Sequence, residues 1–271
     1  IQKSSKRIFE DAGSHRYQIR ICLTGPYTLS SSFTGRDGLL FSRLGEAISQ
    51  VIAASLFNDK YGSVSLVVLD EPVFGLLDDP LIDRGSESRE LLLRAWETIL
   101  QNASVKGAQT GMHLHSTADQ LFWQADSLNI VESHVKDSLY ESERTSKSLE
   151  STDKFLKASI SITNFDQLIG EAMQTRSHSM LSESAKGEAI AKTWKSLKSG
   201  ELDPNTFLET AKLLQKRLIK LVNRFGIERL PYAGPECGLR SFPTYKCALE
   251  SLRRVSSVVN SANREDGLSP M

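Results

Sequence analysis

Short β-like runs alternate with longer segments of helical periodicity, and this alternation restricts the fold more than any other feature of the sequence. Six runs end in polar or glycine-rich clusters and predict strands at 18–23, 63–69, 108–114, 127–131, 158–162 and 227–232. Apolar residues spaced three and four apart predict helices at 39–57, 87–100, 138–156 and 204–225. Strands that alternate with helices pair in parallel through right-handed crossovers. The sequence therefore predicts an α/β protein, with either an open doubly wound sheet or a closed barrel.

Two features favour a barrel of the TIM (β/α)8 type. No glycine-rich nucleotide fingerprint follows the first run, and polar residues follow nearly all the runs. Six strands cannot close a barrel of eight, so the first two β-α units are expected to be missing from this chain. Residues 1–271 are expected to form one barrel domain, with 171–200 as a helical or mobile insertion. Pro204, after Asp203, is expected to open the last helix and Gly226 to end it.

Composition excludes several classes of protein. The chain has 271 residues, with 33 Lys+Arg against 33 Asp+Glu. It therefore carries no net positive charge that would favour binding to nucleic acid or anionic lipid. No window approaches the roughly 18 apolar residues of a membrane span, and the first residues lack the apolar stretch of a secretory signal. Three cysteines cannot form a complete disulfide framework. A cytoplasmic protein that binds neither nucleic acid nor membrane is expected.

A pair of histidines gives the clearest chemical signal. His113 and His115 lie two apart at the end of the third run, in the segment GMHLHS. Side chains two apart on a strand project to the same face, so both imidazoles can reach one metal ion. An isolated His-x-His pair also fits a structural or hydrogen-bonding role.

Two further metal donors follow later runs. Glu132 ends the fourth run and Cys237 follows the last, at topologically equivalent positions. Two imidazoles, a carboxylate and a thiolate are donors that zinc binds, which predicts a site made by His113, His115, Glu132 and Cys237. Two alternatives stay open: Glu132 pairs with a neighbouring lysine, and Cys237 is a small apolar filler before a helix.

Other strand ends supply candidate residues for substrate binding and proton transfer. Asp70 is the first charged residue after an apolar run, where it could bind a substrate ammonium or handle a proton, although it also suits a turn. Gly25 and Pro26 form a rigid turn after the first run. Asn164 and Asp166 follow the fifth run and are expected at the same mouth. The remaining histidines and cysteines are interpreted as packing or surface residues: His15, His134, His178, Cys22 and Cys247.

Taken in order, the strand ends resemble those of a known family. They read LTGPYTL, LDEPVF, MHLHS, NIVES and GPECGL. The series resembles the catalytic barrel of cobalamin-independent methionine synthase, and more closely the short corrinoid-using core methionine synthases, from about Ile19 to about Leu252. The resemblance implies that barrel strands three, four, five, six and eight end at Gly25-Pro26, Asp70, His113, Glu132 and Cys237.

The zinc set of this family departs from the present chain at one position. The family holds zinc with a His, two Cys and a Glu, so His115 stands where the family has a cysteine. Replacing a thiolate by neutral imidazole makes the metal complex more positive, which helps to ionise a bound thiol but makes the thiolate a poorer nucleophile. Methyl on a corrinoid cobalt then suits the reaction better than methyl on a folate amine. The family's proton-donating His is replaced here by the region of Asn164 and Asp166.

The resemblance implies a zinc-dependent methyltransferase that moves a methyl group from methylcobalamin to homocysteine and forms methionine. Asp70 and Asp166 would be its catalytic residues, and Gly25, Pro26, Asp70 and Asn164 would bind the substrate. A separate corrinoid methyl-carrier protein is the implied partner. Alternatives are a methyltetrahydrofolate donor, another thiol such as coenzyme M as acceptor, a metal-free decarboxylase, and a metal-stabilised binding barrel without turnover.

Overall fold

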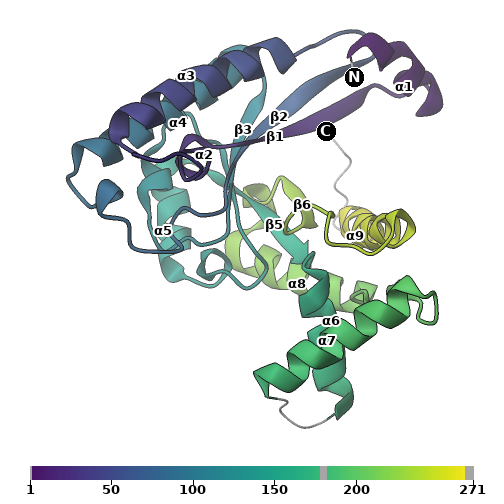
Figure 1. The fold of residues 1–271 in the computed structure, drawn as a ribbon. Helices are drawn as coiled ribbons and strands as arrows, with labels where there is room; N and C mark the ends of the chain where they lie inside the picture. Colours follow the sequence, from purple (N-terminus) through teal and green to yellow (C-terminus); the bar gives the residue numbers. More distant parts are fainter. Residues whose placement is uncertain (1, 178–181, 266–271) are drawn as a thin grey trace. The chain divides into compact units, whose positions relative to one another are not determined.

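The computed structural model describes residues 2–177 and 182–265 and has an α/β architecture (Figure 1). Its strands are β1 (Tyr17–Thr24), β2 (Gly62–Glu71), β3 (Gln109–Leu114), β4 (Ile130–Glu132), β5 (Phe155–Ser161) and β6 (Tyr232–Pro235). The α-helices are α1 (Ser5–Asp11), α2 (Pro26–Ser30), α3 (Gly38–Ser55), α4 (Glu87–Val105), α5 (Glu143–Thr152), α6 (Phe165–Ser177), α7 (Glu183–Lys198), α8 (Ala211–Phe225) and α9 (Tyr245–Glu265). Six short 3-10 turns complete the described elements: η1 (Gln2–Ser4), η2 (Pro80–Ile82), η3 (Leu121–Gln124), η4 (Ser138–Tyr140), η5 (Pro204–Phe207) and η6 (Ile227–Arg229).

The six strands form one curled parallel sheet in sequence order, β1-β2-β3-β4-β5-β6. The α/β class and the parallel pairing predicted from the sequence are therefore confirmed. The described residues contain no pairing between β1 and β6, so the sheet is a half-barrel and a complete TIM barrel is not formed. The chain divides into two compact units, Ile1–Leu156 and Lys157–Met271. That residues 1–271 form one barrel domain stays a prediction.

The first unit contains β1 to β4 and the start of β5, with α3 and α4 packed side by side (Figure 1). β2 is buried on both faces, as is typical of a central parallel strand. The core of the first unit includes a group of aromatic rings. Tyr27 contacts Phe41 and Phe74, and Phe74 contacts Trp96. Burial of these large side chains stabilises the unit by roughly 2 kcal/mol for each fully buried ring.

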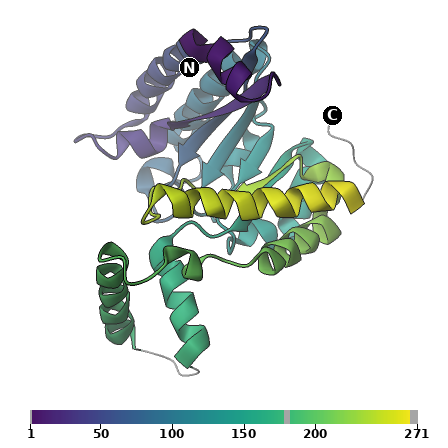
Figure 2. The same cartoon turned by 90° about the vertical axis from the view of Figure 1, so that its right-hand side faces the viewer.

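The second unit contains the rest of β5, β6 and helices α6 to α9, with α6 and α7 lying side by side (Figure 2). Phe165 of α6 contacts Trp194 of α7, Phe207 and Phe242. The predicted insertion at 171–200 covers the end of α6 and all of α7, while 178–181 lie outside the described residues. No described helix combines the length and the apolar character that crossing a bilayer requires.

Several boundaries differ from the sequence prediction, and three of them change how an element begins or ends. Residues 227–229 form the turn η6, and β6 begins only at Tyr232, so the prediction of a strand at 227–232 was wrong. The helix predicted at 138–156 ends at Thr152, because Asp153 adopts a left-handed conformation, and β5 begins at Phe155. Pro204 opens the separate turn η5, while α8 begins at Ala211 behind the N-cap Thr210. Gly226, with φ 83°, ends α8 as predicted.

Candidate metal centre

The carboxyl ends of β2, β3 and β4 bring three of the predicted site residues to one level of the sheet. The parallel register pairs Asp70 with His113, and His113 with Glu132. His113 Nε2 lies 3.9 Å from Asp70 Oδ1, and His113 Nδ1 lies 3.4 Å from Glu132 Oε1. His113 and Glu132 are buried, whereas the Asp70 side chain is 37% exposed. The imidazole of His113 therefore lies between two carboxylates at the edge of the sheet.

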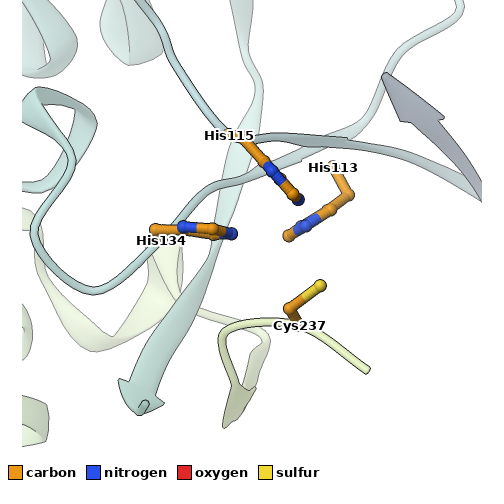
Figure 3. Close-up of side chains that lie close together, drawn as sticks. All are labelled: His113, His115, His134 and Cys237. Atoms are coloured by element: carbon orange, nitrogen blue, oxygen red, sulfur yellow. The ribbon is translucent and has the colours of Figure 1, made fainter. Parts of the chain in front are cut away.

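Three histidines of the first unit gather at this edge. His113 lies on β3, His115 directly follows β3, and His134 follows β4. The ring centroids are 5.2 Å apart for His113 and His115, 5.8 Å for His113 and His134, and 4.1 Å for His115 and His134. The rings point toward one another in Figure 3. The structure thus brings together the two histidines predicted from the sequence and adds a third.

The donor atoms of these histidines fit a metal ion. Each histidine offers one ring nitrogen, and these nitrogens lie within 4.8 Å of one another. Small rotations of the rings bring such nitrogens within bonding distance of one ion, at about 2 Å each. His134 Nε2 is buried and has no hydrogen-bond partner among the described residues, and such an atom is costly to leave without a ligand. The three histidines can therefore hold a metal ion.

Sequence reasoning missed His134, which was interpreted as a packing or surface residue. The signal that could have found it is its position: it lies two residues after Glu132, just beyond the end of β4. A residue beyond a strand end lies in a loop, so strand periodicity does not say where its side chain points. The contact between His134 and His115 becomes visible only from the arrangement of two loops.

Glu132, predicted as a metal ligand, is engaged by an arginine. Arg20 of β1 donates from Nη1 to Glu132 Oε2 at 3.0 Å and from Nη2 to Oε1. Burial works against the charged form of Arg20, but the adjacent carboxylate raises the pKa of the guanidinium above its ordinary value. Direct ligation by Glu132 stays a prediction.

The turn between β1 and α2 lies against the end of β2, as the sequence analysis expected for residues of one rim. Gly25 N donates to Asp70 O at 2.9 Å, and Pro26 is the first residue of α2. A side chain at Gly25 would bring its Cβ into collision with the buried Glu71 carboxylate, so only glycine fits there. The contact of this turn with Asp70 is established, and its role in substrate binding stays a prediction.

The remaining predicted site residues belong to the second unit. Asn164 Oδ1 accepts a hydrogen bond from Gln167 N at the start of α6, and Asp166 Oδ1 accepts one from Trp194 Nε1 at 2.6 Å. Both residues are exposed and stabilise helices, and their roles in substrate binding and catalysis stay predictions. Cys237, also drawn in Figure 3, lies two residues after β6 and is half-buried. Ligation of a metal ion by its thiol stays a prediction.

A cavity of about 750 Å³ lies apart from the histidines, in the first unit. Most of its lining residues come from the segments 75–90 and 118–124, and the ion pair of Arg89 and Asp119 lies in its wall. None of the three histidines lines it. The candidate site is therefore the group of histidines, which this cavity does not include.

Comparison with known proteins gives no family for the chain. No protein-family model matches it, and no curated protein matches it either.

Proposed function

We propose that the chain is a metal-dependent methyltransferase that transfers a methyl group to a thiol. The observation that carries this proposal is the group of three histidines at the carboxyl ends of β3 and β4, of which His113 lies beside Asp70. Zinc prefers such nitrogen donors, and it lowers the pKa of a bound thiol so that the thiolate forms near neutral pH. The resemblance in the strand ends favours homocysteine as the acceptor and a corrinoid-bound methyl group as the donor.

The residues of the first unit have separate roles in this proposal. His113, His115 and His134 hold the metal ion. Asp70, whose carboxylate is partly exposed beside His113, pairs with the ammonium of the amino acid and so directs its sulfur. The thiol loses its proton to solvent, its sulfur forms a bond to the methyl carbon, and the bond between that carbon and the carrier breaks. We assign Cys237 of the second unit as a further ligand, because a thiolate completes a set of donors that zinc favours.

A second candidate function follows from the number of donors. Three imidazoles and one thiolate would fill the four positions of a tetrahedral zinc ion, which is typical of structural sites. Under this alternative the ion stabilises a binding domain and no reaction occurs. The methyltransferase requires that a substrate thiol displaces one ligand or enters a fifth position.

The test uses the full chain loaded with zinc and supplied with homocysteine. We expect methionine to form with methylcobalamin and not with methyltetrahydrofolate, and His115→Ala to lower the rate by at least about 100-fold because a metal ligand is lost. His15→Ala, which changes an exposed histidine elsewhere in the first unit, is the matched control and should keep the wild-type rate. Mass spectrometry of the methionine formed provides the measurement.

Two results would count against this function. Methionine formed with methyltetrahydrofolate alone would overturn the choice of donor. A chain that binds zinc but forms no methionine with either donor, and whose bound Co²⁺ spectrum does not respond to homocysteine, would favour the structural metal site.

A further inference from the structure

Two charged side chains connect β1 to His113, the histidine that lies between the carboxylates of Asp70 and Glu132. Arg20 of β1 binds Glu132 of β4, and Glu132 Oε1 lies 3.4 Å from His113 Nδ1. The Glu132 side chain is only 2% exposed, and that of Arg20 is 33% exposed. A buried carboxylate needs a counter-charge and hydrogen-bond donors, and the guanidinium supplies both. Arg20 thus fixes the orientation of a carboxylate that touches a metal-binding histidine.

The two nitrogens of His113 lie in different surroundings. Nδ1 faces Glu132, and Nε2 lies on the other side of the ring, 3.9 Å from Asp70 Oδ1. A carboxylate beside Nδ1 favours the tautomer that carries its proton on Nδ1, which leaves the lone pair of Nε2 for a metal ion.

We propose that Glu132 is a positioning residue for His113, and that Arg20 acts on the metal site by holding Glu132. This inference rests on the proposed metal site and assigns Glu132 a different role from the direct ligation expected from the strand-end pattern. The guanidinium binds both carboxylate oxygens of Glu132. A carboxylate held in this way keeps Oε1 at 3.4 Å from His113 Nδ1 and is less available to the metal ion itself. His113, His115 and His134 then supply the nitrogen donors.

The test is a Co²⁺ titration of the full chain after removal of its metal, with the absorption spectrum recorded to saturation. Glu132→Gln should weaken Co²⁺ binding about 10- to 100-fold, the usual effect of losing a carboxylate beside a ligating histidine. Its spectrum at saturation should keep the shape of the wild-type spectrum, because the atoms bonded to the ion are unchanged. Arg20→Gln should also weaken binding, since the carboxylate loses its orientation.

The double variant tests whether the two residues act in series. If Arg20 acts through Glu132, Arg20→Gln combined with Glu132→Gln should bind Co²⁺ no more weakly than Glu132→Gln alone. Arg89→Gln is the matched control, because it breaks another arginine–carboxylate pair of the first unit, with Asp119, and should leave Co²⁺ affinity at the wild-type value.

Each contrary result has a distinct meaning. A changed spectrum for Glu132→Gln would make Glu132 a direct ligand, and wild-type affinity in that variant would remove its role altogether; both overturn this inference while leaving the proposed function standing. If Glu132→Gln does not fold, wild-type affinity in Arg20→Gln overturns the inference equally, since Arg20 is partly exposed and tolerates replacement better. A wild-type chain that binds no Co²⁺ would overturn both this inference and the proposed function.

Discussion

At the scale of single residues, Glu71 lies next to Asp70 and receives three hydrogen bonds at its carboxylate. Its carboxylate is fully buried and accepts hydrogen bonds from Trp96 Nε1 at 2.8 Å, Tyr27 N at 3.0 Å and Thr28 N at 2.7 Å. Burial raises the pKa of Glu71, and the N–H donors oppose that rise. Through these hydrogen bonds Glu71 connects the first turn of α2 to the end of β2, next to Asp70.

Replacing this carboxylate by an amide should destabilise the fold. In Glu71→Gln the amide NH2 meets groups that can only donate, so at least one buried N–H loses its acceptor. We expect the free energy of unfolding to fall by about 1–3 kcal/mol. Urea denaturation at neutral pH provides the measurement, with the exposed Glu46→Gln on α3 as control. Equal stability of wild type and Glu71→Gln would show that the three hydrogen bonds contribute little.

The candidate site was partly predictable from its residues. His113 and His115 follow from strand periodicity, and Asp70 and Glu132 follow from their positions at strand ends, since parallel register brings such positions to one level. The bond between Arg20 and Glu132 could not be predicted, because it joins strands that are not neighbours in the sheet. His134 was missed because no periodicity extends into the loop after β4.

At the scale of elements, the start of α4 is fixed by its cap and by an ion pair. Ser86 caps the helix by accepting from Arg89 N, and the Arg89 guanidinium binds both oxygens of Asp119, which lies after β3. Burial works to raise the pKa of Asp119, but the hydrogen bonds from Arg89 and from Leu121 N hold it below the ordinary value of 3.8. The ion pair therefore connects the first turn of α4 to the loop that follows β3, the strand that carries His113.

The ion pair of Arg89 and Asp119 should stabilise the fold at neutral pH and less so at acid pH. Because the folded state lowers the pKa of Asp119, its contribution is present above the unfolded pKa of 3.8 and is lost as the pH falls through the folded value. We expect Asp119→Asn to be less stable than wild type at about pH 6, and the difference to shrink at about pH 3. Urea denaturation at both values measures it. A difference that is the same at both pH values would contradict the assigned ion pair.

Element types were more predictable than element ends. Buried runs such as β2 and amphipathic segments such as α3 carry long periodic patterns, so their positions were predicted within two residues. The prediction of a strand at 227–232 was wrong because residues 227–229 form the turn η6, so that β6 begins only at Tyr232. The helix at 138–156 was extended too far because one left-handed residue, Asp153, separates α5 from β5.

At the scale of the whole molecule, the alternation of strands and helices predicted the class of fold but not its closure. Parallel neighbours follow from local alternation, and all five pairings between consecutive strands are present. Closure depends on a contact between the first and last strands, which no local pattern encodes, and the described sheet stays open. The proposed function depends on a metal ion at the three histidines, since the proposed chemistry requires one.

Zinc content is therefore the most direct test of the central claim that three histidines bind a metal ion. Chain purified with zinc present and then dialysed should retain about one equivalent by mass spectrometry, and His113→Ala, His115→Ala and His134→Ala should each lose it. His15→Ala should retain it. Wild-type chain without zinc, or full zinc content in all three variants of the cluster, would contradict the account.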